Sequence, residues 1–354
     1  MGYIVIAIYV TASFFALFEE KMLKYRKPIF LIVGLMLVLL AGLREVGIDP
    51  DSENYEYTYQ HYYATSSLLS VEYSFLFISQ LLNVLTSNVH ALFLLYATFG
   101  VGLKMYAISK ISKLWFIPLA VYISYYFVMH ECMQIRTGIL SGMFLLAIKE
   151  LGDGNRKKAL ICILIGGLFH YSAIALLPLL FLSSHEISKK KRMIWLSLIP
   201  LSYALYVGGF SILLNSSVNI PYIGEKLAIY QAGVEKGNLN IASVNVFSPL
   251  QILTLLVYGY LFYFQDTITS FNRYFPLLLK IFTLGICSYV AFGFFPVLGQ
   301  RISLLYNVVT LIVYANIYYT IRPKWASIVI VFLMGILYLN YSLLNIDMVL
   351  LWKV

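Results

Sequence analysis

Three arginines that could bind phosphate stand at the ends of apolar runs: Arg44, Arg136 and Arg301. A guanidinium group stays charged and can hold phosphate oxygens through two parallel hydrogen bonds. A charge at such a place costs free energy unless it is paired or solvated, so each arginine is a candidate functional residue. If the three converge at a membrane surface, they would form a seat for a diphosphate headgroup.

Groups that could accept a proton are expected on the same face. Carboxylates and imidazoles are the side chains here that could act as a general base toward a sugar hydroxyl. The candidates are Asp49, Asp51, Glu53, Glu72, Glu131, His61, His130 and His170. No metal is expected, because Asp49, Asp51 and Glu53 are isolated and lack the glycine at the sixth position of a calcium loop.

Structural interpretations of the same residues stand beside this one. Each arginine could reach to the membrane interface or pair with Glu72 or Glu131. His170 could be a hydrogen-bonded histidine inside a helical hairpin. The five tyrosines between residues 55 and 63 are more typical of an interfacial aromatic belt than of a surface that stacks on sugars.

The composition sets the class of protein that must position these residues. Of the 354 residues, 61% are hydrophobic and 12% are charged, whereas about 25% are charged in a typical soluble domain. Apolar runs of the length that crosses a bilayer recur along the chain. We therefore expect an all-α polytopic membrane protein, a single transmembrane domain over residues 1–354 with about 12 transmembrane helices and a range of roughly 10 to 13. The net charge of +9 is assigned to cytoplasmic loops, so no nucleic-acid partner is expected.

The distribution of lysine and arginine orients the chain. All but six of the 25 lie on the side predicted to be cytoplasmic; Lys104 is placed there, just after a span. The six expected outside are Arg44, Arg136, Lys226, Lys236, Arg301 and Lys353. Outer loops are predicted at residues 44–71 and 214–245. The predicted crossings include residues 3–18, 28–43, 114–129, 137–149, 194–213, 246–264, 276–297, 302–320 and 325–350.

Two segments depart from simple crossings. Residues 72–103 must cross an odd number of times, so one of their two apolar pieces should lie in the interface or re-enter. Residues 158–183 lie between two basic loops, which predicts a short helical hairpin with Gly166, Gly167 and His170 at its turn. Gly138 and Gly142 have the spacing that permits close helix packing.

The order of several short motifs resembles a known family. The motifs are Gly42-Leu43-Arg44 with Gly47, Asp49 and Tyr55; Glu72-Tyr73; Gln134-Ile135-Arg136; Phe169-His170-Tyr171-Ser172-Ala173; and Arg301 with Ser303. Together they resemble the EpsG-like branch of the Wzy polysaccharide polymerases, from about residue 40 to residue 305. The segment Glu131-Cys132-Met133 is less typical, and no role is carried over to it.

The resemblance implies a glycosyltransferase that makes O-antigen or capsular polysaccharide at the outer face of the bacterial cytoplasmic membrane, without metal or other cofactor. It would transfer the growing chain from undecaprenyl diphosphate to a sugar hydroxyl of an incoming lipid-linked repeat unit. The partners would be this lipid-linked oligosaccharide as donor and acceptor and the bilayer, and a chain-length regulator is a further candidate partner.

The resemblance also suggests roles for individual residues. Arg136 and Arg301, then Arg44, would hold the diphosphate, with Gln134 and Tyr55 as further substrate-binding residues. Asp49, Glu72 and His170 remain equal candidates for the base.

Two other functions are alternatives to polymerisation. A flippase or transporter of lipid-linked oligosaccharide would need charges deep in several spans. A membrane acyltransferase would need a catalytic histidine at the cytoplasmic or mid-membrane level.

Overall fold

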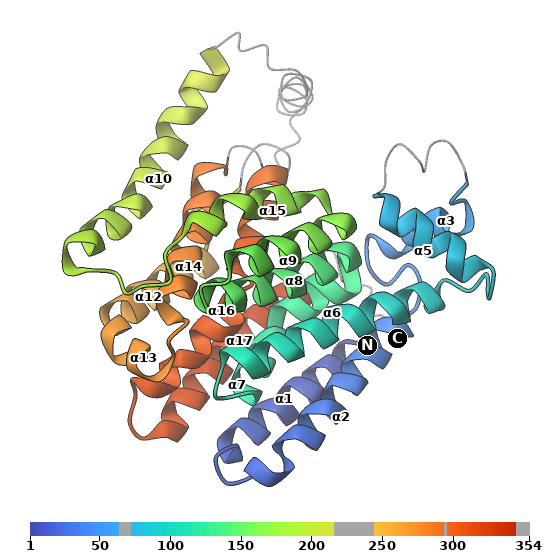
Figure 1. Cartoon of the computed structure of the whole chain (residues 1–354), viewed down its shortest axis with the longest axis horizontal. Helices are drawn as coiled ribbons and strands as arrows, with labels where there is room; N and C mark the ends of the chain where they lie inside the picture. Colours follow the sequence, from blue (N-terminus) through green and yellow to red (C-terminus); the bar gives the residue numbers. More distant parts are fainter. Residues whose placement is uncertain (64–71, 216–243, 294–295, 345–354) are drawn as a thin grey trace. The chain divides into compact units, whose positions relative to one another are not determined.

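The computed structural model describes residues 1–63, 72–215, 244–293 and 296–344. These residues form α, π and 3₁₀ helices and contain no strand (Figure 1). They divide into two compact units. Unit 1 comprises residues 1–184, 264–277 and 308–354, and unit 2 comprises residues 185–263 and 278–307.

Unit 1 begins with two apolar helices, α1 (Gly2–Phe18) and α2 (Leu23–Gly42). They match the predicted spans 3–18 and 28–43. The turn between them carries the buried Glu19, whose two carboxylate oxygens accept hydrogen bonds from the backbone nitrogens of Trp115 and Phe116, at 2.6 and 3.1 Å. These two N–H groups begin helix α7 (Phe116–Val121) and would otherwise lack acceptors, so Glu19 fixes the start of α7 against the α1–α2 turn.

The first outer loop contains the short helix α3 (Ser52–Gln60), and residues 64–71 lie outside the described residues. Two helices follow, α5 (Tyr73–Asn83) and α6 (His90–Ile111). The 11 residues of α5 extend about 17 Å, too short for the ~30 Å hydrocarbon layer. Its exposed face is apolar and includes Tyr73, Phe77 and Leu81. A short helix with such a face fits the predicted interfacial or re-entrant piece, while α6 has the length of a span.

A π-helix interrupts the next predicted span. Helix α7 continues directly into η1 (Tyr122–Met133), a π-helix, and α8 (Ile135–Gly152) follows after Gln134. Helix α8 packs against both α6 and α9 (Arg156–Phe169). Gly142 makes this packing possible, since a Cβ added to it would lie 2.7 Å from the Cβ of Leu103. The close contact expected from the glycine spacing is therefore present.

The predicted hairpin at residues 158–183 corresponds to α9 and η2 (Tyr171–Phe181), a 3₁₀ helix. The two helices pack together, and a Cβ added to Gly167 would lie 3.3 Å from that of Ala173. His170 lies at the break between them in an extended conformation. The remaining elements of unit 1 are α13 (Gln265–Phe271), the first residues of α14, α16 (Thr310–Val313), η4 (Tyr314–Tyr319) and α17 (Lys324–Leu344).

Unit 2 contains α10 (Lys189–Asn215), α12 (Pro249–Tyr263), most of α14 (Phe275–Ala291) and α15 (Pro296–Asn307). Within it, the Thr283 hydroxyl of α14 donates to Tyr258 of α12, at 3.1 Å. Most of the second predicted outer loop, residues 216–243, lies outside the described residues, as do Lys226, Lys236 and Lys353.

Five helical stretches within the described residues are long and apolar enough to cross a membrane. They are Leu23–Gly42, His90–Ile111, Phe116–Met133, Gly299–Tyr319 and Lys324–Leu343. Four further apolar helices are shorter, at 10–17 residues. The all-α prediction is confirmed for the described residues, whereas the expected number of about 12 crossings stays a prediction.

Candidate functional site

Arg44 and Asp49 form an ion pair inside unit 1. Arg44 follows α2, and its Nε donates to Asp49 Oδ2 at 3.0 Å while its Nη1 donates to the Ala41 carbonyl at 2.6 Å. The guanidinium carbon lies 3.9 Å from the centre of the Phe93 ring. Both partners are almost wholly buried, so this arginine is held by the protein itself. Its Nη2 is buried and has no hydrogen-bond partner among the described residues.

The second carboxylate oxygen of Asp49 organises the start of α3. Asp49 Oδ1 accepts the backbone N–H groups of Asp51 and Ser52, at 3.1 and 3.0 Å. The Ser52 hydroxyl in turn accepts the N–H of Gly47, at 2.8 Å. Gly47 has a φ of +85°, a conformation that residues with a Cβ rarely adopt. The Gly47, Asp49 and Ser52 positions thus build one tight turn, and Asp49 uses both of its oxygens within it.

Arg136 and Glu72 form a second ion pair, which is partly open to solvent. Arg136 lies in the first turn of α8, and its Nη1 donates to Oε2 of Glu72, the residue before α5. The Arg136 side chain is 22% exposed and that of Glu72 is 5% exposed. Glu72 Oε1 also accepts the backbone N–H of Tyr171, at 3.4 Å. The beginnings of α5, α8 and η2 therefore meet at one carboxylate.

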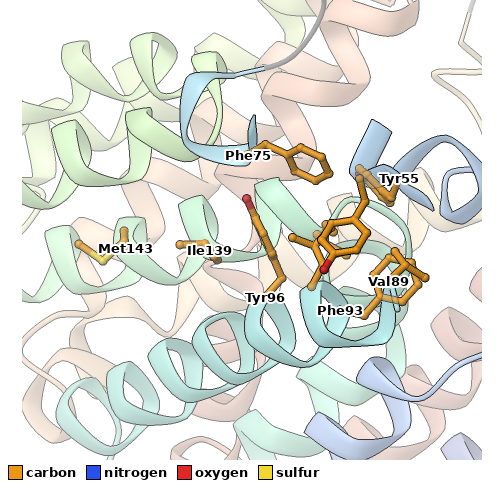
Figure 2. Close-up of a cluster of buried hydrophobic side chains, with 10 residues drawn as sticks. Tyr55, Phe75, Val89, Phe93, Tyr96, Ile139 and Met143 are labelled. Atoms are coloured by element: carbon orange, nitrogen blue, oxygen red, sulfur yellow. The ribbon is translucent and has the colours of Figure 1, made fainter. Parts of the chain in front are cut away.

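Tyr55, Phe75, Phe93 and Tyr96 form an aromatic cluster (Figure 2), and rings of this cluster contact both arginines. The Arg136 guanidinium is 5.8 Å from the Tyr55 ring and 5.7 Å from the Phe75 ring. The ring centres of Tyr55 and Phe93 lie 6.5 Å apart in an edge-to-face arrangement, and the Arg44 guanidinium lies over the Phe93 ring. One set of rings therefore contacts both cations, while the predicted substrate-binding roles of Arg44, Arg136 and Tyr55 stay predictions.

Burial raises the pKa of Tyr55. Removal from water raises the pKa of its hydroxyl to about 12, although the positive charge of Arg136 opposes the shift. A phenol is protonated near neutral pH even at its ordinary pKa of about 10, so the hydroxyl has a proton to donate with or without this shift. The Tyr96 hydroxyl from the same cluster is buried and has no hydrogen-bond partner among the described residues.

His170 acts locally as the cap of the 3₁₀ helix η2. Its Nδ1 accepts the backbone N–H of Ser172, at 3.1 Å. In a neutral imidazole the other ring nitrogen then carries the proton. This hydrogen bond favours the structural interpretation of His170, since the nitrogen that lacks a proton is already engaged.

Two predicted site residues occupy different surroundings. Gln134 lies at the break between η1 and α8, and its backbone N–H is bonded to the Met129 carbonyl at 2.9 Å. Arg301 lies on α15 in unit 2, and its side chain is exposed. Convergence of Arg301 with Arg44 and Arg136 stays a prediction.

One charged pair was missed from the sequence. Lys104, expected in a cytoplasmic loop, instead lies inside α6 and is fully buried. Its Nζ donates to Oε1 of the equally buried Glu131, at 2.6 Å. The placement of Lys104 was wrong because its charge is neutralised by a partner 27 residues away, and sequence counts of loop charges cannot include that partner. Glu131 was expected on the outer face and Lys104 on the cytoplasmic side, and their contact shows that the two residues lie together.

Comparison with known proteins identifies the family. The model of the EpsG family matches residues 27–349. The chain belongs to the EpsG family. It is also 24% identical over 328 residues to the amylovoran biosynthesis protein AmsC of Erwinia amylovora, covering 88% of this chain and 84% of that protein. No solved structure matches the chain.

The matched region contains every residue of the predicted site, from Arg44 to Arg301. The resemblance inferred from the short motifs is therefore confirmed at the level of the family. Together with the apolar helices, membership of this family makes the chain an integral membrane protein.

Proposed function

We propose that this protein is a polysaccharide polymerase that joins lipid-linked oligosaccharide repeat units. The EpsG family and the relative named for amylovoran biosynthesis support a role in polysaccharide biosynthesis. The observation that carries the chemical part is the Arg136–Glu72 pair. It offers a phosphate-binding cation and a carboxylate in contact, at a place that solvent reaches.

The proposed reaction transfers a growing chain from undecaprenyl diphosphate. A hydroxyl oxygen of the acceptor's terminal sugar forms a bond to the anomeric carbon of the donor. The bond from that carbon to the diphosphate oxygen breaks, and its electron pair leaves with the lipid diphosphate. The hydroxyl proton passes to a base on the protein. Because negative charge grows on the departing diphosphate, a fixed guanidinium beside it lowers the barrier.

Arg136 is the arginine best suited to that task in unit 1. It is partly exposed, whereas Arg44 is enclosed and already bound to Asp49. A bidentate diphosphate would compete with Glu72 for the Arg136 guanidinium. In this proposal substrate binding draws Arg136 away from Glu72, and the site gains a free carboxylate as it gains the substrate.

Glu72 is then the preferred base among the three candidates. Asp49 has both oxygens engaged by Arg44 and by the start of α3. His170 has its Nδ1 engaged by Ser172. Glu72 is held by Arg136 and by the long contact to Tyr171, so loss of the first partner would leave it able to accept the hydroxyl proton.

The experiment supplies purified protein in nanodiscs with lipid-linked single repeat units and nothing else. A ladder of longer products without nucleotide sugar or ATP is the expected result, because the donor's sugar–diphosphate bond already carries the required energy. Arg136→Lys keeps the charge but loses the planar fork, and should lower the rate about 10²-fold or more. Arg273→Lys is the matched control, since Arg273 is also an arginine of unit 1 but lies 71% exposed against Asp153.

The same assay separates the competing functions. A flippase would move the repeat units between leaflets and leave their length unchanged. Single repeats that stay single with folded protein and competent lipid substrate would end the polymerase proposal. The buried Lys104–Glu131 pair does not by itself favour transport, since the two charges neutralise each other and neither side chain is exposed.

A further inference from the structure

A buried polar cluster of Lys104, Glu131 and Tyr122 joins helix α6 to the π-helix η1. Glu131 Oε1 accepts both the Lys104 ammonium at 2.6 Å and the Tyr122 hydroxyl at 2.9 Å. None of the three residues is exposed by more than 1%. A buried ion pair is weak evidence for stability, because an apolar replacement of similar volume is often as stable. The hydrogen bonds of this cluster therefore matter mainly for the elements that they hold in place.

Lys104 contacts both sides of the break between η1 and α8. Besides Glu131, which lies before the break, its Nζ donates to the carbonyl of Gly138, which lies after it, at 2.6 Å. The Ser141 hydroxyl donates to the same carbonyl at 3.0 Å. One ammonium group thus ties the last turn of the π-helix to the first turn of α8.

Arg136 lies between the two residues, Glu131 and Gly138, that Lys104 joins. At the break, Gln134 departs from helical geometry with φ −99° and ψ 62°, so the directions of η1 and α8 are not set by a continuous helix. Arg136 is the second residue of α8, between Glu131 and Gly138 in sequence. Any change in the angle at the break would move its guanidinium relative to Glu72.

Two glycines leave space for the Glu131 carboxylate. A Cβ added to Gly100 of α6 would lie 2.0 Å from Glu131 Oε2, and one added to Gly138 would lie 2.5 Å from it. Either methyl group would displace the carboxylate. Gly102, on the same helix as Gly100, has no atom within 4 Å of an added Cβ and provides a matched control.

We propose that Lys104 and Glu131 are positioning residues that set Arg136 for the transfer reaction. The proposal rests on the proposed function for its catalytic consequence, but the tie across the break is tested independently. Neither residue touches the substrate. Their effect passes through the Gly138 carbonyl and the orientation of the first turn of α8.

The test replaces the whole cluster in one variant, Lys104→Met with Glu131→Leu and Tyr122→Phe, so that no buried charge is left unpaired. Hydrogen–deuterium exchange should become at least about 10-fold faster at the amides of residues 134–138, because their opening becomes easier. In the ladder assay kcat should fall about 10²-fold and KM should change much less, since a misplaced guanidinium acts on the transition state.

A stability role predicts a different outcome. If the cluster only stabilised the fold, exchange in the triple variant would be unchanged or would accelerate throughout unit 1 rather than selectively at residues 134–138, and kcat per folded molecule would stay at the wild-type value; either result would overturn the proposal. If the triple variant is not recovered as folded protein, Gly100→Ala decides by the same two measurements, with Gly102→Ala expected to match wild type. Wild-type exchange and kcat in Gly100→Ala would equally overturn it.

The two proposals fail separately. If the wild-type protein makes no polymer but the variants exchange faster at the break, the polymerase proposal is wrong and the contact of Lys104 across the break is supported. If the variants make normal polymer and show normal exchange, the positioning role of Lys104 and Glu131 is wrong and the polymerase proposal stands.

Discussion

Glu72 accepts the backbone N–H of Tyr171 at 3.4 Å, although the two residues are 99 positions apart. The same carboxylate holds Arg136. The loop before α5, the start of α8 and the residue after His170 therefore depend on a single side chain. Loss of its charge and loss of its shape should have different consequences.

Glu72→Gln should keep the fold and lose the reaction. The amide oxygen can still accept from Tyr171 or Arg136, but it cannot take a proton, and removal of a general base typically lowers rates by about 10²–10⁴-fold. The rate of ladder formation and the thermal midpoint of the purified variant are the measurements. Ladder formation at the wild-type rate would exclude Glu72 as the base.

Arg44 should behave differently from Arg136. Arg44→Met leaves the buried Asp49 carboxylate without its cation, a change that costs roughly 3–5 kcal/mol, so the protein should be lost from the membrane. Adding Asp49→Asn, which keeps the Oδ1 contacts to the start of α3, should recover much of the loss. Arg136→Lys should instead remain abundant while its rate falls about 10²-fold or more. An abundant but inactive Arg44→Met protein would move Arg44 from the structural to the substrate-binding residues.

Variants of His170 distinguish a helix-capping role from a general-base role. If its imidazole were the base, the rate would fall below about pH 6.5 and this acid limb would disappear with the imidazole. Because Nδ1 caps η2, we expect His170→Asn to retain activity and the wild-type pH profile, as asparagine can accept the same N–H. His170→Ala should lose about 1 kcal/mol of stability. A pH profile that loses its acid limb in His170→Asn would restore His170 as the base.

Much of the fold was accessible from sequence because local apolar runs determine it. Helices α1, α2 and α17 lie over such runs, although α2 begins at Leu23, ahead of the predicted span 28–43, and the predicted end of the last span at residue 350 lies outside the described residues. The break at His170 was predicted from two basic loops too close together for a pair of full spans. The π-helix η1 was not predicted, because the register of its backbone hydrogen bonds depends on packing rather than on composition.

The candidate site was predictable in its members but not in its pairings. Arg136 and Glu72 were each singled out, and their pairing was considered only as one alternative. Side chains 64 residues apart meet here because α5 packs against α6 and α9, the two helices that also pack against α8, and such tertiary contacts leave no local signal. Lys104 shows the same limit more strongly, since a lysine near the end of an apolar run reads as a loop charge until Glu131 is seen beside it.

Asp153, which lies outside the predicted spans, gives a prediction for how the stability of the protein depends on pH. It accepts hydrogen bonds from Arg273 at 2.6 Å and Tyr274 at 2.9 Å, and Lys149 lies at 3.0 Å. Burial alone would raise the pKa of Asp153, but the hydrogen bonds from Lys149 and Tyr274 outweigh it and the pKa is lowered.

A lowered folded-state pKa stabilises the protein above the ordinary value of about 3.9, and this contribution disappears as the pH falls through the folded-state pKa. Asp153→Asn should therefore be less stable than wild type at pH 7 by up to about 1 kcal/mol, because the cluster is partly exposed. The difference in thermal midpoint should shrink as the pH falls below the ordinary value of about 3.9. A difference that stays constant across this range would show that the charge of Asp153 contributes nothing.

The orientation of the site in the membrane is the remaining prediction. The lysine and arginine distribution places Arg44, Arg136 and the first outer loop outside and residue 188 inside. Asn54 is the suitable probe in that loop, because it is exposed, whereas its neighbour Ser52 is fully buried and bonded to Gly47. In cells whose native cysteines have been replaced, Asn54→Cys should react with a membrane-impermeant maleimide, and Ser188→Cys should react only after the membrane is opened. Ser188→Cys reacting in intact cells while Asn54→Cys does not would invert the topology. It would put the Arg136–Glu72 pair on the cytoplasmic side, where an outward-facing polymerase could not use it.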